Sequence, residues 1–249
     1  MRYVVENICG ELYEVRTIMP QGASPETYEP TPRQMMELSE SRIIFCAGSL
    51  GFEQTSLPKM HTAAPQVPLI SLENGVTLLD DPDAHHGEAS GYDPHTWMST
   101  ENLRIYARNA CDALCRLDSV HADSFRVNLV RFEEKLSALD TELSSTLKPL
   151  STRSFLIYHP ALGYFARQYG LRQMAVEADG KEPSVSRMQT LVAACSESGA
   201  KVCFISKEHA GEGARRIAEN VGLSVVEINP LAYDVPAQMR SIAKALKDE

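Results

Sequence analysis

The strongest constraint on the fold is an alternation, from residue 154 onward, of short apolar runs with amphipathic helical patterns. The runs are nearly continuous in apolar residues, which is typical of strands buried on both faces of a sheet. Strands that alternate with helices form a parallel sheet covered by helices. The expected strands are 155–158, a short one around Met174, 201–205 and 224–228, and the expected helices are 161–169, 184–198, 211–221 and 235–246. This half of the chain is therefore predicted to be a doubly wound α/β domain.

The first part of the chain shows a second α/β pattern. Thr31 to Gln34 has the form of a capping box with proline at the first helical position, so a helix should begin there and end near Ser39. Another helix should open the chain and close at Gly10, and a third should follow Ser99 or Thr100. The expected strands are Tyr13–Met19, where polar and apolar residues alternate, Ile43–Ala47 and Pro68–Leu72.

The longest helical pattern separates these two parts. Apolar residues recur at spacings of three and four from Phe125 to Leu147, and Pro149 ends the pattern. A helix over Ala122–Leu147 would be about 39 Å long, more than a small lobe needs. It is either an additional cover helix or a rigid connector. We predict an α/β protein of two doubly wound lobes joined by one long helix, with lobes at 1–118 and 151–249 and the connector at 119–150.

Composition narrows the class of function. The net charge of −9 argues against a nucleic-acid partner and is compatible with cation binding. No apolar run approaches the roughly 18 residues that a membrane-spanning helix needs. The six cysteines form no CxxC pair and most lie in apolar elements, so we expect buried free thiols rather than disulfides or a thiolate metal site.

His159 follows the expected strand 155–158 directly, and Pro160 prevents that strand from continuing. The imidazole should therefore lie at the carboxyl edge of a parallel sheet, where open α/β folds bind their ligands. A histidine that is merely hydrogen-bonded at a strand end is an equally good reading of this residue alone.

Three further loop positions near expected strand ends carry metal-binding groups: Glu26, His95 and the segment from Asn229 to Asp234. Imidazole nitrogens with a carboxylate suit Zn²⁺ or a related divalent ion. No Gly-rich phosphate loop follows any expected strand, which argues against a nucleotide site. The long spacing between these residues makes the signal weak when it is taken alone.

Four motifs give the chain a specific resemblance. In order they are GASPETYEPTP at 22–32, DPHTW at 93–97, HPALGYF at 159–165 and GKEPS at 180–184. Together they resemble the zinc/manganese solute-binding proteins of bacterial ABC importers, over the whole chain. The resemblance implies a high-affinity receptor that binds Zn²⁺, or alternatively Mn²⁺, in a cleft between two lobes. It also implies delivery of the metal to an ABC permease.

The same resemblance implies a ligand set. His95 and His159 match two ligand motifs of the family directly, whereas Glu26 replaces the usual histidine of the first motif, with Glu29 as a nearby rival. The family's fourth ligand, an aspartate, is replaced by Asn229, so Asp234 or water would complete the shell. His85 and His86, among acidic residues of the loop 80–91, are either part of a solvated loop or a weak auxiliary capture site.

Members of this family carry an export or lipoprotein leader and a first strand before the opening helix. The sequence begins without either, and we expect Met1 to be an artificial or misassigned start, or to mark a truncated product. The resemblance implies a periplasmic or lipid-anchored monomer facing outside the cytoplasm. The alternatives are a zinc hydrolase, for which the chain has no HExxH or GxSxG motif, and a surface adhesin.

Overall fold

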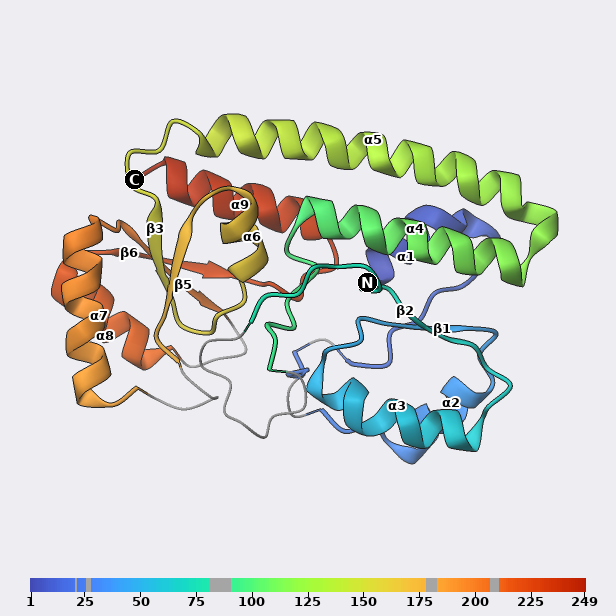
Figure 1. Cartoon of the computed structure of the whole chain (residues 1–249). Coiled ribbons are helices and arrows are strands. Elements are labelled where there is room, and N and C mark those ends of the chain that lie inside the picture. The colour runs from blue at the N-terminus through green and yellow to red at the C-terminus, as the bar shows by residue number, and fades with distance from the viewer. Residues whose placement is uncertain (21, 26–27, 81–90, 178–182, 207–210) are drawn as a thin grey trace. The chain divides into compact units, whose positions relative to one another are not determined.

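The computed structural model describes residues 1–20, 22–25, 28–80, 91–177, 183–206 and 211–249 (Figure 1). The chain divides into two compact units. Unit 1 consists of Met1–Leu78 with Thr100–Ser137, and unit 2 of Leu79–Ser99 with Ala138–Glu249. Both units combine helices with parallel strands, which confirms the predicted α/β class.

Unit 1 is built around a short parallel pair of strands. Strands β1 and β2 pair in register, with Ile44 opposite Leu69. Its elements are α1 (Arg2–Cys9), η1 (Gly10–Leu12), α2 (Pro32–Ser39), β1 (Ile44–Cys46), α3 (Gly51–Ala63), β2 (Leu69–Ser71), α4 (Thr100–Leu117), η2 (Ser119–His121) and the first part of α5 (Ala122–Leu147). Helix α2 begins at the predicted capping box: the Thr31 hydroxyl accepts from the Gln34 N–H, and the Gln34 side chain accepts from the Thr31 N–H.

The strand predicted at Tyr13–Met19 is wrong, because this segment is irregular. Alternation makes a strand only where a neighbouring strand supplies hydrogen bonds, and in the described part of the chain β1 pairs with β2 alone. Polar groups of the segment bond to side chains instead. The Tyr13 hydroxyl donates to Asp118, and the Ile18 carbonyl accepts from the side chains of Tyr28 and Gln34.

Unit 2 contains a four-stranded parallel sheet in the order β4-β3-β5-β6. Figure 1 shows α7 and α8 on one face of this sheet and α6 and α9 on the other, which is the predicted doubly wound arrangement. The elements are β3 (Ser154–Ile157), α6 (Gly163–Gln168), β4 (Arg172–Ala175), α7 (Val185–Ser198), β5 (Val202–Ser206), α8 (Glu212–Val221), β6 (Ser224–Ile228) and α9 (Val235–Lys247). All carboxyl ends of these strands lie at one edge, so the loops that follow them can meet there.

The described residues of the segment Leu79–Ser99, which are 79–80 and 91–99, belong to unit 2, whereas the sequence analysis expected them in the first lobe. Side-chain hydrogen bonds explain the difference. The Trp97 indole N–H donates to the Pro230 carbonyl at 2.9 Å, and the Ser99 hydroxyl donates to Gln168 at 2.8 Å. Helix α5 has the predicted bounds. Its residues up to Ser137 belong to unit 1, and those from Ala138 onward belong to unit 2.

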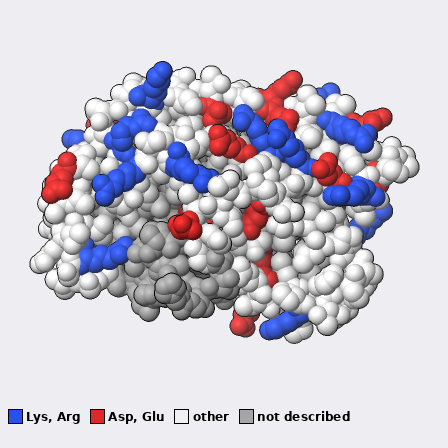
Figure 2. Space-filling model, in the orientation of Figure 1, with Lys and Arg blue, Asp and Glu red and all other residues white. Residues whose placement is uncertain are grey.

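Charged side chains of both signs are interspersed over the face shown in Figure 2. Some of them pair between helices within one unit. In unit 1 Arg108 of α4 lies 2.6 Å from Glu133 of α5, and in unit 2 Arg240 of α9 lies 2.8 Å from Glu142 of α5. Exposed ion pairs contribute little to stability, so the fold depends chiefly on its buried apolar residues. Among the helices described, none is long and apolar enough to cross a membrane.

All six cysteines are free, as predicted, and only Cys115 is not fully buried. Burial raises the pKa of the Cys46, Cys111 and Cys203 thiols to about 12, and it raises the pKa of Cys9 and Cys195 as well. Since the thiolate is the reactive form, these groups should react slowly in the folded protein.

We expect dithionitrobenzoate to modify at most one thiol rapidly at pH 8, and all six after unfolding in guanidinium. Cys115→Ser should remove the fast phase, and a second fast thiol would contradict the burial.

Candidate metal centre

His159 lies where the sequence predicted, at the carboxyl edge of the unit 2 sheet. Strand β3 ends at Ile157, and the Tyr158 N–H still bonds to the Phe204 carbonyl of β5. The chain then turns sharply, with the Ala161 N–H donating to the His159 carbonyl at 2.7 Å. Because Pro160 has no N–H to continue the ladder, the imidazole projects beyond the last pairing of the strand.

His95 is held by an acidic neighbour in its own motif. One oxygen of Asp93, Oδ1, accepts from the His95 backbone N–H at 2.9 Å and lies 2.8 Å from His95 Nδ1. The residue is almost completely buried, with a relative exposure of 5%. The ring of Trp97 lies beside it, with ring centres 5.3 Å apart. These contacts fix both the position and the rotation of the imidazole.

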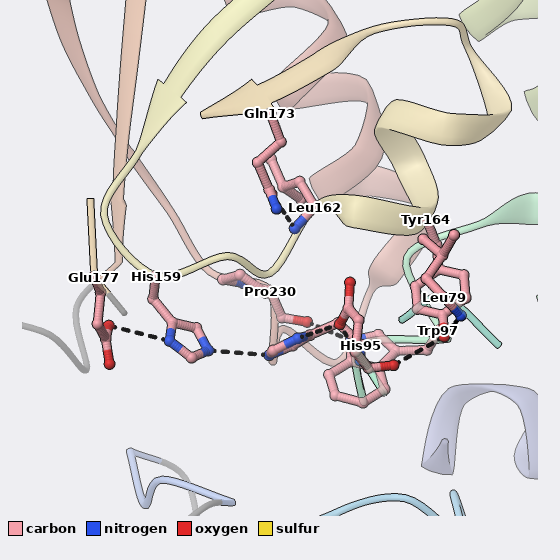
Figure 3. A network of polar contacts seen from close by, with 10 residues as sticks. Leu79, His95, Trp97, His159, Leu162, Tyr164, Gln173, Glu177 and Pro230 are labelled. Atoms are coloured by element: carbon pink, nitrogen blue, oxygen red, sulfur yellow. Dashed lines mark hydrogen bonds and ion pairs between the residues drawn. The ribbon is translucent and has the colours of Figure 1, made fainter. Parts of the chain in front are cut away.

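The two imidazoles meet through their Nε2 atoms. His95 Nε2 and His159 Nε2 are 3.2 Å apart, and the ring planes are inclined by 73°. The opposite nitrogen of each ring faces a carboxylate: Asp93 for His95, and Glu177 for His159 at 3.1 Å. Figure 3 shows this line of side chains from Glu177 through both imidazoles. We name the set of Asp93, His95, His159 and Glu177 the imidazole centre.

The carboxylates determine what the imidazole centre can bind. A carboxylate accepts a hydrogen bond, so each Nδ1 carries the proton and each Nε2 presents a lone pair. Two lone pairs at this separation repel each other unless a cation lies between them. Two imidazole nitrogens on a tetrahedral Zn²⁺, at about 2.05 Å each, are about 3.3 Å apart. The observed separation therefore fits two ligands of one divalent metal ion, with carboxylates behind them as is usual for metal-binding histidines.

Glu177 is a residue that the sequence reasoning missed. It follows β4, is 4% exposed, and its backbone N–H donates to the Tyr158 carbonyl at 3.0 Å. Its place in the sheet repeats that of His159: Glu177 stands two residues beyond the end of β4, and His159 stands two residues beyond the end of β3. Asp93 lies in the DPHTW motif, and the sequence predicted no role for its side chain.

Of the other predicted ligands, the structure describes only Asp234 and Asn229, and both side chains make local hydrogen bonds. Glu26, His85 and His86 lie outside the described residues. Asp234 is exposed and caps α9, its Oδ1 accepting from the Ala237 N–H at 2.9 Å. The Asn229 side chain accepts from the Leu231 N–H at 3.0 Å. Within the described ranges no group of three or more His, Cys, Asp or Glu side chains is placed to hold a metal ion.

Trp97 should report binding at the imidazole centre, because it is the only tryptophan and its ring lies beside His95. We expect Zn²⁺ to change its emission intensity and the change to saturate at one equivalent. A fluorescence titration measures this directly. The His95→Ala variant should lose the response. An unchanged emission during a titration in which calorimetry records binding would place the metal elsewhere.

Comparisons with known proteins identify the family of this chain. A family model described as "Zinc-uptake complex component A periplasmic" (ZnuA) matches residues 1–248. A putative metal-binding protein of Treponema pallidum (strain Nichols) is 29% identical over 241 residues, covering 92% of this chain and 76% of that protein.

Solved structures show the same relationship. A crystal structure of ZnuA superposes with a TM-score of 0.91 at 32% identity, covering 99% of this chain and 94% of that one. A zinc-bound ZnuA deletion mutant gives a TM-score of 0.90 at 33% identity, covering 98% and 92% of the two chains. Because the family model matches residues 1–248, this chain belongs to the ZnuA family of zinc-uptake proteins.

Proposed function

We propose that this protein is the extracytoplasmic receptor of a zinc importer. In this proposal it binds one Zn²⁺ through Nε2 of His95 and of His159 and releases the ion to an ABC permease. The observation that carries the proposal is the pair of converging Nε2 atoms, 3.2 Å apart and each backed by a carboxylate. Zinc is the cargo of such a protein and not a resident cofactor.

Proteins of this family are metal-binding receptors and not enzymes, which removes the hydrolase alternative. The chemistry of the imidazole centre agrees. A zinc hydrolase needs a general base beside the metal-bound water. Here Asp93 and Glu177 both face imidazole Nδ1 atoms, and this geometry serves to orient ligands.

The remaining ligands are proposed from the resemblance. Glu26 is the third ligand, and Asp234, Asn229 or water is the fourth. Two imidazoles favour Zn²⁺ over Mn²⁺, because Mn²⁺ prefers oxygen ligands and lies lower in the affinity order of divalent ions. One structural neighbour, the ZnuA deletion mutant, is a zinc-bound structure, which supports the same choice. We further propose a monomer located in the periplasm or anchored by a lipid outside the cytoplasm.

Calorimetric titration of metal-free protein with Zn²⁺ and Mn²⁺ tests the function. The proposal expects one tight Zn²⁺ site, weaker Mn²⁺ binding, and no turnover of ester, peptide or phosphate substrates by the zinc-loaded protein. Because ligating imidazoles must be neutral, zinc affinity should fall as the solution is acidified. Absence of stoichiometric zinc binding at neutral pH would refute the proposal.

Glu26 should contribute less to zinc binding than either histidine, because Glu29 or water can take its place. We expect Glu26→Ala to weaken zinc binding by less than His95→Ala or His159→Ala does. Glu26→His should keep or raise the preference for Zn²⁺ over Mn²⁺, since imidazole suits zinc better. Competition titrations with a chromophoric chelator measure both ratios. An equal loss in the Glu26 and histidine variants would show that no other group replaces this carboxylate.

A further inference from the structure

Tyr164, the second residue of α6, joins two distant points of the chain near the imidazole centre. Its side chain is fully buried. The hydroxyl donates to the Asp93 carbonyl at 2.8 Å and accepts from the Leu79 N–H at 3.0 Å, as Figure 3 shows. The Asp93 N–H in turn donates to the Leu79 carbonyl at 2.9 Å. One phenol therefore fixes the backbone of the residue whose carboxylate orients His95.

Gly163, immediately before Tyr164, leaves room for the Asp93 carboxylate. A Cβ atom at Gly163 would clash with Asp93 Oδ2, because the two would lie well inside van der Waals contact. Gly163 is the first residue of α6 and is not among the glycines with positive φ, so its backbone could accept alanine. The need for glycine here comes from the Asp93 side chain and not from the helix.

We propose that Gly163 and Tyr164 are positioning residues for metal binding. They hold Asp93 in place, and Asp93 orients the His95 imidazole so that its Nε2 faces Nε2 of His159. Tyr164 holds the Asp93 backbone, Gly163 admits its carboxylate, and Oδ1 of that carboxylate contacts both the backbone N–H and Nδ1 of His95. The inference deepens the proposed function and rests on it.

The arrangement makes one short segment responsible for both imidazoles. His159 lies four residues before Gly163 in the connection between β3 and α6, so this connection carries one ligand directly and orients the other. A displaced Asp93 would let the His95 ring rotate, and Nε2 would no longer face its partner. Loss of groups that orient metal-binding histidines typically lowers metal affinity by about 10- to 100-fold.

Two variants and one matched control test the proposal in the full chain. Gly163→Ala pushes on the Asp93 carboxylate, and Tyr164→Phe removes only the hydroxyl. The control is Tyr169→Phe, which removes the hydroxyl of another buried tyrosine of unit 2, one that donates to Asp140 at 3.0 Å. Zinc affinity is measured by chelator competition, thermal unfolding by circular dichroism, and the His95 tautomer of metal-free protein by ¹⁵N NMR.

We expect Gly163→Ala and Tyr164→Phe to bind zinc about tenfold or more weakly, to remain folded, and to lose the single Nδ1–H tautomer of His95. Tyr169→Phe should keep the parent's affinity and tautomer. Thermal unfolding is measured for each variant, so weaker binding by a Gly163→Ala protein that unfolds like the parent is not a general loss of stability. If one variant fails to fold, the other carries the test.

Both variants within twofold of the parent in affinity, with an unchanged tautomer, would overturn the inference. An equal loss in Tyr169→Phe would also overturn it. Failure of this inference can be told apart from failure of the proposed function. A parent protein that binds no zinc would refute the receptor function. The His95 tautomer in metal-free protein would still show whether Gly163 and Tyr164 orient His95.

Discussion

The His159→Ala variant should lose tight zinc binding altogether, with affinity falling by at least about 100-fold, because a ligand counts for more than the groups that orient it. His159 supplies one of the two converging Nε2 atoms, and its partner, His95 Nε2, is 3.2 Å away. Without the His159 imidazole, His95 Nε2 and any oxygen ligands can form only a weak metal site that exchanges its ion rapidly. Calorimetry at neutral pH with metal-free protein measures the loss.

His95→Ala should show the same loss, since the two imidazoles are equivalent as donors. A suitable control is His121→Ala. His121 also contacts an aspartate through Nδ1, at 2.7 Å from Asp118, but it lies in η2 of unit 1. The zinc affinity of the His121→Ala protein should equal that of the parent. A His159→Ala protein that binds zinc as tightly as the parent would mean that the carboxyl edge of this sheet is not the metal site.

Local signals predicted the helices well. Helix α5 has the expected bounds because its apolar spacing and the stop at Pro149 are both written in consecutive residues. The strands of unit 2 were also found. Strands β3, β5 and β6 are largely apolar runs between helices, and β4 is a short segment around Met174 with two polar residues. The segment 13–19 shows where such signals fail. Its alternation is as regular as that of a strand, but a strand also needs a partner, and consecutive residues do not reveal whether one is present.

The same contrast applies to the imidazole centre. His95 and His159 could be selected one at a time, because each stands in a recognisable motif. Glu177 acquires its role only from sheet pairing. Strand β3 pairs with β4 so that Ile157 lies opposite Ala175, and the same register two residues further on brings His159 level with Glu177. The order β4-β3 is a property of the folded sheet, so this partnership was not visible in the sequence.

Asp234 illustrates a competing use of a carboxylate. The sequence offered it as a fourth ligand on the basis of its place after the last strand. It also precedes Val235 and Pro236, the start of a helical pattern, and aspartate followed closely by proline is a typical helix start. The structure has it capping α9. A local hydrogen-bonding role of this kind could have been weighed against the metal role from the sequence alone.

The Glu177→Gln variant should bind zinc about 10- to 100-fold more weakly than the parent. The carboxylate accepts from His159 Nδ1 at 3.1 Å, which keeps the proton on that nitrogen and the lone pair on Nε2. It also makes the imidazole a stronger donor to a cation. Glutamine keeps the shape and one acceptor oxygen but loses the negative charge, so the orientation is partly retained while the electrostatic support is removed.

A comparison with Glu177→Ala separates the two contributions. Alanine removes charge and hydrogen bond together, so its loss should exceed that of glutamine if orientation matters as well as charge. Asp140→Asn is the matched control, because Asp140 is a part-buried carboxylate of unit 2 that accepts from Gln168 and Tyr169. It should leave zinc affinity unchanged. If Glu177→Ala and Glu177→Gln both bind like the parent, the carboxylate does not support His159, and the pairing of β3 with β4 has no part in metal capture.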